Sequence, residues 1–272
     1  MRIGWKCVPA EQAQGRDSID ATSAEFAESM GYGTRQYDTP ADFLAFHSSP
    51  WIRELHAALA ELLDRHRSVL SVGSGECEHE VPFVLDGYDI LASDVVDSGA
   101  LSRRLFPSLR FQTFDVLDPR PIGTFDDVLI TGLDSYFADD EFSRVIGNVR
   151  ALLGPGGRLL MTLRYRDNPA TWVIDRIGIP ASCAMLRLAS LVGTTERRWV
   201  MKRHGYRRSM REIVRMAAVH GFRLGRVRHA GFGGELTRVY VDRVVPPLYA
   251  LMRAIDRRLH VFNTAIVFEF LT

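Results

Sequence analysis

Short apolar runs alternate with segments of helical spacing through the middle of the chain, and no other feature constrains the fold as strongly. The runs that we predict to be buried strands cover residues 69–72, 89–93, 110–114, 127–131 and 158–163. Between them stand segments in which apolar residues recur every three or four positions, the spacing that places them on one face of a helix. Alternating strands and helices build a parallel sheet with helices on both faces. The chain is therefore predicted to have an α/β, doubly wound and mostly parallel sheet.

Glycine and proline limit these elements and divide the chain. Gly154-Pro155-Gly156-Gly157 should end a helix over 141–153, and Ser49-Pro50 should begin the first helix of the core. After Arg164 the pattern becomes irregular until a helix over 210–220. The later expected elements are a strand over 222–229, a helix opened by Pro246-Pro247 and a strand over 265–271. We expect four parts: an N-terminal helical arm or lid (1–48), the core (49–165), a variable lid or substrate segment (166–208), and a C-terminal part with an inserted helix (209–272).

A glycine-rich turn follows the first strand of the core. Gly73-Ser74-Gly75 comes directly after 69–72, where glycine lets the backbone approach a ligand and the next helix presents free N–H groups. Asp94 stands about 20 residues further on, at the end of the second strand, where a carboxylate accepts hydrogen bonds from ribose hydroxyls. A dinucleotide site fits these two features equally well.

Further motifs favour a different cofactor. Asp115 ends the third strand, where its carboxylate can bind an adenine amino group, and Phe125-Asp126-Asp127-Val128-Leu129-Ile130 forms the fourth strand. The fifth strand follows the Gly-Pro-Gly-Gly turn. Together with 69–75 and Asp94, this set resembles the class I S-adenosylmethionine (SAM)-dependent methyltransferases, a Rossmann-like family, in order and spacing. The resemblance is firm over residues 50–165, and the C-terminal helix and strands are similar to the last elements of that family.

The resemblance implies a seven-stranded sheet with an antiparallel last strand, SAM as the cofactor, and methyl transfer to a small molecule. It also implies roles by position. The backbone of the glycine turn should contact the methionine half of SAM, and the other contacts should lie on the ribose, the adenine and the sulfonium side. The residues so assigned are Tyr37 as a cover, Gly73, Ser74, Gly75, Asp94, Val95, Asp115, Val116, Thr131 and Gly132.

The sequence departs from the family pattern at two positions. Ser71 stands where the family usually has an acid two residues before the first glycine, and Cys77 stands at the third glycine position. Glu76 and Glu78 are the candidates to supply the missing carboxylate, although acids are also common at the start of a helix. The missing third glycine also weakens the nicotinamide alternative.

Catalytic residues are less constrained, because SAM carries its own electrophile and the protein need only align the acceptor and exclude water. Tyr136 follows the fourth strand and Tyr165 the fifth, at the edge where doubly wound folds bind ligands. His204 can act as a general base. These three are our catalytic candidates, and each could equally be a packing or surface residue. No group of residues has metal-ligand spacing, so no metal is expected.

Composition excludes some classes of protein and leaves others open. The 272 residues are 46% hydrophobic and 25% charged with a net charge of +1, which gives no general attraction to nucleic acid or anionic lipid. Three widely spaced cysteines indicate a reducing compartment. Charges interrupt the apolar stretches too soon for a membrane span, and we expect a cytoplasmic protein.

Two alternatives remain open. Residues 197–228 are rich in arginine and could bind RNA, as in an RNA-modifying methyltransferase, although we favour a surface that pairs with acids of the N-terminal arm. The run Thr131-Gly132-Leu133-Asp134 also differs from the Asn/Asp-Pro-Pro-Tyr run of many base methylases. The second alternative is a SAM-using enzyme of another outcome, such as intramolecular cyclisation or transfer of another SAM substituent.

Overall fold

The predicted alternation of strands and helices is present in the computed structural model, which describes residues 2–9, 37–48, 50–164, 176–177, 179–191, 199–232 and 263–272. The strands are β1 (Arg2–Pro9), β2 (Val69–Val72), β3 (Ile90–Asp94), β4 (Arg110–Thr113), β5 (Phe125–Thr131), β6 (Leu153–Arg164), β7 (Trp199–Arg207), β8 (Arg223–Phe232) and β9 (Asn263–Leu271). The helices are α3 (Pro40–Phe46), α4 (Pro50–Ala60), α5 (Glu80–Leu85), α6 (Ala100–Leu105), the 3-10 helix η1 (Leu133–Ser135), α7 (Asp139–Leu152), α9 (Ile179–Leu191) and α10 (Met210–Val219).

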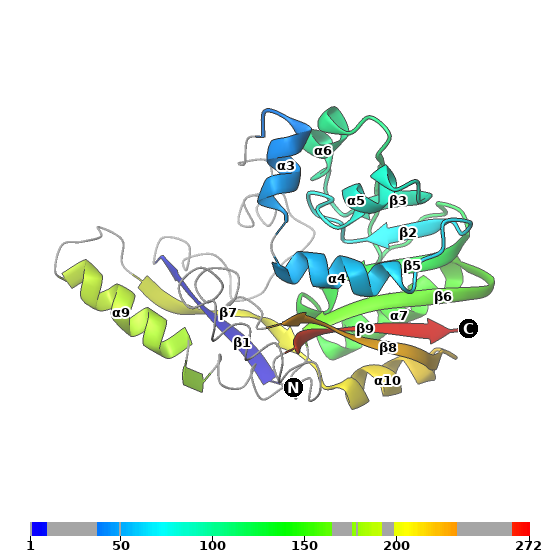
Figure 1. Cartoon of the computed structure of the whole chain (residues 1–272). Helices are drawn as coiled ribbons and strands as arrows, with labels where there is room; N and C mark the ends of the chain where they lie inside the picture. Colours follow the sequence, from blue (N-terminus) through cyan, green and yellow to red (C-terminus); the bar gives the residue numbers. More distant parts are fainter. Residues whose placement is uncertain are drawn as a thin grey trace.

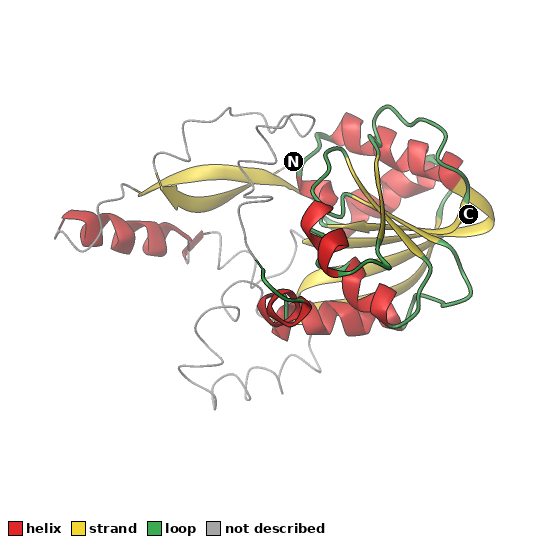
Figure 2. Cartoon of the chain, turned by 90° about the horizontal axis from the view of Figure 1, so that it is seen from above, coloured by secondary structure: helices red, strands yellow, loops and turns green. Residues whose placement is uncertain are grey.

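Seven of the described strands form one mixed sheet in the order β4-β3-β2-β5-β6-β9-β8. The first five of these strands run parallel to one another. Strand β9 runs antiparallel to both β6 and β8. Helices cover both faces of the sheet (Figure 2). The predicted fold class, including the antiparallel last strand, is confirmed.

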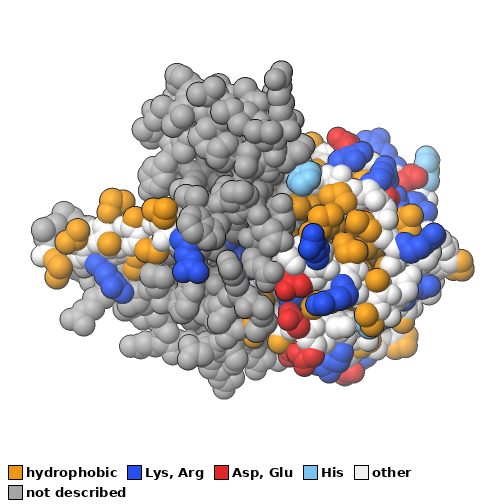
Figure 3. Space-filling model, turned by 90° about the horizontal axis from the view of Figure 1, so that it is seen from below, with side chains coloured by type: hydrophobic (Ala, Val, Ile, Leu, Met, Phe, Trp, Pro, Cys, Tyr) orange, Lys and Arg blue, Asp and Glu red, His pale blue; other side chains and the backbone are white. Residues whose placement is uncertain are grey.

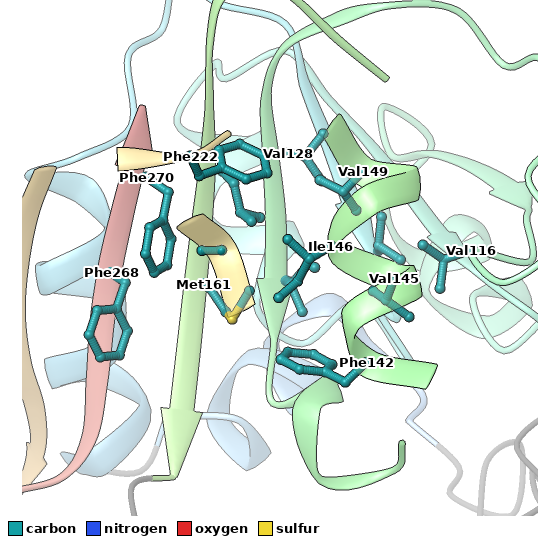
Figure 4. Close-up of a cluster of buried hydrophobic side chains, with 14 of the residues drawn as sticks. Val116, Val128, Phe142, Val145, Ile146, Val149, Met161, Phe222, Phe268 and Phe270 are labelled. Carbon is teal, nitrogen blue, oxygen red and sulfur yellow. The ribbon is translucent and has the colours of Figure 1, made fainter. Parts of the chain in front are cut away.

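Alternating side chains of the strands supply two apolar layers. Leu70 and Val72 of β2 lie in the cluster under α7 and α10, whereas Val69 lies in the cluster under α4. In Figure 4 the α7 residues Phe142, Val145, Ile146 and Val149 face the sheet over Val128 and Met161. Each large apolar side chain that is fully buried stabilises the fold by about 1.5–3 kcal/mol, so this layer holds α7 in place.

A buried ion-pair network joins four strands. Asp127 of β5 is fully buried and accepts hydrogen bonds from Arg67 Nε (3.0 Å) and from Arg158 Nε and Nη2 (2.9 and 2.5 Å). Arg158 Nη1 also donates to Glu269 of β9 (2.9 Å). Hydrogen bonds from Arg226 of β8 are the main cause that lowers the pKa of Glu269 to about 2. The network therefore fixes β9 between β6 and β8.

Outside residues 49–165, the secondary structure differs from the sequence prediction. Within the expected helical arm, Arg2–Pro9 is a strand that pairs antiparallel with β7, and only α3 is helical in residues 37–48. The expected irregular segment 166–208 contains α9 and β7. The reason is that β1 and β7 stabilise each other across a very long sequence separation, which local periodicity does not show. Residues 10–36 and the helix expected from Pro246 lie outside the described residues.

Several boundaries also differ. Strand β6 begins at Leu153, through the Gly-Pro-Gly-Gly turn, because Phe125 pairs with Leu153 before a register shift in β5. Strand β4 ends at Thr113, so Asp115 lies beyond the strand rather than at its end. Helix α5 starts only at Glu80, and turns fill the space after Gly75. The structure thus leaves a longer loop at the glycine turn than the sequence suggested.

Strand β2 points toward the side of the core on which α3 and the β1–β7 ribbon lie, and β9 points away from it (Figure 1). Helix α9 packs beside β1 and β7 and extends outward from the core. Met185, Leu188 and Leu191 of α9 are exposed apolar residues, and Figure 3 shows apolar side chains along the protruding helix. None of the helices in the described ranges has the length and apolar character needed to cross a membrane.

Candidate functional site

The glycine turn after β2 has a backbone that only glycine adopts easily. Gly73 and Gly75 have φ values of +74° and +53°. A Cβ atom at position 73 would also lie 2.7 Å from Leu133 Cδ1, which belongs to the loop after β5. The sequence therefore needs glycine at position 73 both for its conformation and for the close approach of two loops at the carboxyl edge of the sheet.

Asp94 fixes this turn against the end of β3. Its Oδ2 atom accepts a hydrogen bond from the Gly75 amide (2.8 Å) and its Oδ1 atom accepts one from the Val95 amide (2.7 Å). Burial raises the pKa of the Asp94 carboxyl, and these amide hydrogen bonds oppose the rise. Each carboxylate oxygen has two lone pairs, so Asp94 can hold the turn and still accept hydrogen bonds from hydroxyls of a ligand.

A buried set of serines ties the turn to the neighbouring strand. Ser74 Oγ and Ser93 Oγ both donate to the carbonyl oxygen of Ser71 (3.2 and 2.8 Å). The amide of Ser74 donates to Ser93 O (2.9 Å), and the amide of Ser93 donates to Ser74 Oγ (3.2 Å). These bonds cross between the ends of β2 and β3, so the turn is held in place without a ligand.

The carboxylate that approaches Ser71 comes from helix α5. Ser71 Oγ donates to Glu80 Oε1 (2.6 Å), and Glu80 is fully buried. Burial is the main cause that raises the pKa of Glu80 to about 7, and the hydrogen bond from Ser71 opposes this rise. The sequence pointed to Glu76 or Glu78 for this carboxylate, whereas the structure places Glu80 beside Ser71. A signal was available, because Glu80 begins the run Glu80-Val81-Pro82-Phe83, in which an acid sits beside residues of an apolar helix face.

Cys77 occupies the third glycine position with φ +62°, the one positive φ among the described residues other than glycine. A residue with a Cβ atom thus adopts the left-handed conformation at this position. Burial, the largest cause, raises the pKa of the Cys77 thiol well above its ordinary value. The thiol therefore stays protonated at neutral pH and is a poor nucleophile.

The adenine-side candidates lie at the loop after β4. Asp115 Oδ1 accepts a hydrogen bond from the Leu117 amide (2.8 Å), which closes a local turn. Val116 is buried, and its carbonyl oxygen accepts a hydrogen bond from Asn148 Nδ2 of α7 (2.7 Å). Val95 is half-buried beyond the end of β3. The structure thus places these side chains after two adjacent strands on the same edge of the sheet.

The end of β5 carries an unpaired polar atom. Among the described residues, Thr131 Oγ1 is buried and has no hydrogen-bond partner. Gly132 follows with φ +70°, where a non-glycine residue would be strained. A buried hydroxyl without a partner is uncommon in proteins, so Thr131 fits a site that a polar ligand group completes.

The loop beyond Gly132 is held by a buried arginine. Arg208, which follows β7, donates to the carbonyl oxygens of Asp134 and Phe137, and its Nε donates to Asp139 Oδ1 (3.0 Å). Its guanidinium also lies over the ring of Phe142 (4.5 Å to the centroid). Tyr136, a catalytic candidate, is half-buried in this loop. The β1–β7 ribbon is therefore joined to the loop through Arg208.

The structure describes the remaining candidates for cofactor binding and catalysis only in part. Tyr37 is buried beside α3, and its hydroxyl contacts His47 Nε2 (3.1 Å). Tyr165 lies outside the described residues. His204 belongs to β7, at the register shift between Arg203 and Gly205, and its side chain is outside the description. Among the described residues, no three potential ligands converge on a metal site.

Three arginines of the basic stretch 197–228 are in ion pairs. Arg208 pairs with Asp139, Arg226 with Glu269, and Arg228 with Glu61. The sequence-based interpretation of a pairing surface holds for these three, but their partners Asp139, Glu269 and Glu61 do not belong to the N-terminal arm. The acids of that arm fall outside the described residues. Paired arginines have less capacity to bind phosphates.

The residues present fit S-adenosylmethionine at this edge. The glycine turn leaves no room for a Cβ atom at Gly73, the Asp94 carboxylate stands at the end of β3, and Thr131 offers a buried hydroxyl without a partner. The arrangement can hold a ribose and the methionine half of the cofactor between the ends of β2, β3 and β5.

The fold is that of the class I SAM-dependent methyltransferases. The chain covers 92% of its length on the magnesium protoporphyrin IX methyltransferase from Synechocystis PCC 6803 with bound S-adenosylhomocysteine (SAH), and 94% of that chain, at 14% identity and a TM-score of 0.52. It is also similar to the 1,6-didemethyltoxoflavin-N1-methyltransferase from Burkholderia thailandensis, with 17% identity, a TM-score of 0.53 and coverage of 84% of this chain and 80% of that one.

A third similar structure is a SAM-dependent methyltransferase from Thermotoga maritima described as a possible histamine N-methyltransferase. It shares 11% identity, with a TM-score of 0.54 and coverage of 85% of this chain and 93% of that one. The sequence matches no protein-family model, and no curated protein matches it significantly. At these identities, the likeness establishes the fold alone.

Proposed function

We propose that the chain is a SAM-dependent methyltransferase that acts on a small molecule. The observation that supports this most is the turn at Gly73–Gly75, which the Asp94 carboxylate holds in the orientation that brings its backbone to the edge of the sheet. The similar structures with bound SAM or SAH add support through their shared fold. Their own substrates differ from one another, and the acceptor of this chain is not taken from any of them.

The chain's residues would perform three tasks. The turn and Asp94 bind the cofactor, which supplies an electrophilic methyl group when it is bound. Thr131 and Gly132 line the side on which the acceptor must approach, because ligands lie beyond the carboxyl ends of the strands. The loop that holds Tyr136, fixed by Arg208, forms the next part of that side. Alignment of the acceptor with the methyl group and exclusion of water supply the rate enhancement.

Calorimetry tests the proposal directly. The wild-type chain should bind SAH and show no measurable binding of NADH. Asp94→Ala should weaken SAH binding by at least ~1.5 kcal/mol, the scale of a charge-assisted hydrogen bond. Asp97→Ala is the matched control, because Asp97 is an exposed carboxylate nearby that pairs with Arg103. An unchanged SAH affinity in folded Asp94→Ala would remove Asp94 from the ribose role, and absence of SAH binding by the wild type would overturn the proposal.

An RNA acceptor is the second candidate, because of the basic stretch. The pairing of Arg208, Arg226 and Arg228 with acids favours a small-molecule acceptor. In a mobility-shift assay, RNA binding should be weak and lost at moderate salt. Tight binding of a structured RNA that survives such salt would reverse this preference.

A further inference from the structure

Helix α9 carries an exposed apolar stripe along one of its faces. The exposed residues at positions 181, 184, 185, 188 and 191 have the spacing that places side chains on a single helix face. Two alanines come first, followed by Met185, Leu188 and Leu191, which are 65%, 62% and 81% exposed. Cys183 lies on the opposite face and is only 2% exposed. One face of α9 is thus buried, and the opposite face, the α9 stripe, is apolar and exposed.

The helix is also nearly apolar around its whole circumference. Its 13 residues, IPASCAMLRLASL, contain two serines and one charged residue, Arg187, which lies at the edge of the α9 stripe. A helix that is apolar all round is normally buried on all sides. The β1–β7 ribbon is only two strands wide, and α9 packs on it with one side. Because 13 residues are too few to span a membrane, the exposed side fits a protein surface.

The charge of the α9 stripe narrows the choice of partner. All five of its residues are uncharged. Binding to an anionic lipid surface or to a nucleic acid draws on clusters of basic residues, and the stripe has only Arg187 at its edge. A surface that pairs with its own copy must avoid like charges in contact, and an uncharged stripe meets this condition. The chemistry of the stripe therefore favours an uncharged apolar partner, such as a second copy of α9.

The order of small and large residues makes the α9 stripe complementary to itself. In a pair related by a twofold axis, residue i of one copy contacts residue j of the other, and j contacts i. Two α9 helices that run antiparallel, with the axis level with the middle of the stripe, place Ala184 opposite Leu188 of the partner subunit. The same arrangement places Ala181 opposite Leu191 of the partner subunit. Each large side chain then meets a small one, as close packing of two helices requires.

We propose that α9 is a dimerisation surface, on which a second copy of this chain docks its own α9 in antiparallel orientation. The helix extends outward from the core in Figure 1, which lets a second copy reach it. Its 13 residues span about 20 Å at 1.5 Å per residue. A helix pair of this length buries an area at the low end for protein interfaces, where complexes are weak and transient. The dimer should therefore have a Kd in the micromolar range and dissociate on dilution.

The test is sedimentation velocity of the wild type over a wide range of micromolar concentrations, together with variants that exchange residue sizes. Leu188→Ala and Ala184→Leu should each raise the Kd of the dimer about tenfold, because each change occurs twice in a twofold interface. The double variant Ala184→Leu/Leu188→Ala restores a large residue opposite a small one, and its Kd should return to within about threefold of the wild type. Val219→Ala is the matched control, since Val219 of α10 is 74% exposed, and it should dimerise as the wild type does.

Circular dichroism and the melting temperature establish that each variant is folded, and the exchange Ala181→Leu/Leu191→Ala repeats the test if a variant at 184 or 188 is not. A wild-type chain that stays monomeric at every concentration would overturn the proposal. A double variant as weak as the single ones would do the same, because antiparallel self-pairing requires the restoration. Flotation with phosphatidylcholine vesicles tests the lipid alternative: a monomer that binds vesicles, and loses this binding in Leu188→Ala, would assign the α9 stripe to a membrane surface instead. None of these measurements needs SAH, so they stand apart from the proposed function.

Discussion

The buried acid Glu80 should make the stability of the protein depend on pH in a direction opposite to that of most carboxylates. Its folded-state pKa is about 7, against an ordinary value of 4.5. The native state therefore holds the proton more tightly than the unfolded chain. The free energy of unfolding should be highest at or below pH 4.5 as far as this group is concerned, and should fall as the pH rises from 4.5 to 7. Above pH 7 the loss is complete.

The size of the effect follows from the difference between the two pKa values. At 1.36 kcal/mol per pH unit, the rise to about 7 corresponds to about 3 kcal/mol. Glu80→Gln keeps an acceptor for Ser71 Oγ and cannot ionise. It should therefore be more stable than the wild type above pH 7, by up to about 3 kcal/mol, and should lose this advantage toward pH 4.5.

Urea unfolding followed by tryptophan fluorescence, at intervals from pH 5 to pH 8.5, measures this difference. Comparing the two proteins at each pH removes the contributions of groups that titrate alike in both; Glu78 and the Cys77 thiol are the ionisable groups that interact with Glu80. Glu61→Gln is the control, because its side chain is 59% exposed. If the stabilities of wild type and Glu80→Gln ran parallel over the whole range, the carboxyl would not be perturbed and the argument from burial would be refuted.

Three further substitutions test the packing of the site and of the core. Gly73→Ala should destabilise the fold by about 1–2 kcal/mol, because alanine is strained in the left-handed backbone conformation of Gly73. It should also weaken SAH binding in calorimetry, because the added Cβ atom meets Leu133. Gly156→Ala is the control: Gly156 has φ +70° and no atom within 4 Å of the added Cβ, so this variant should show the backbone cost alone. Asp127→Asn should lower the urea-unfolding free energy by about 3 kcal/mol, because Arg67 and Arg158 lose the charge of the fully buried carboxylate that they share. Arg208→Lys should lower the melting temperature by the equivalent of about 2 kcal/mol, since two carbonyl oxygens lose their donor; an unchanged melting temperature would show that the loop after β5 does not need this residue.

The sheet could be predicted because its information is local. Each strand of the core is a short apolar run, each neighbouring helix has its own periodicity, and glycine marks the turn after β2. Asp94 was placed at the end of β3 by its distance from that turn, and the structure has it there. Its contact with the Gly75 amide is a consequence of parallel neighbouring strands, whose carboxyl ends meet at one edge.

The parts that were missed depend on contacts between distant segments. Nothing in the residues around Arg2–Pro9 indicates β7 as their partner, so the sequence predicted a helical arm or lid. Glu80 was overlooked because its relation to Ser71 depends on where α5 begins, and turns delay that start beyond the glycine turn. The sequence does not indicate that His47 meets Glu78, since the two are brought together only when α3 packs against the loop after β2.

The position of β9 has a consequence for how the chain is made. Synthesis proceeds from the N-terminus, and domains begin to fold while it continues. Strand β9 follows β8 in the chain but lies inside the sheet, between β6 and β8. Until Asn263–Leu271 has left the ribosome, β6 ends the nascent sheet with an open edge and β8 lacks the neighbour to which it bonds. Open edges invite pairing with other chains. The sheet can therefore close only after Asn263–Leu271 has been made, and chains that lack these residues should aggregate rather than fold.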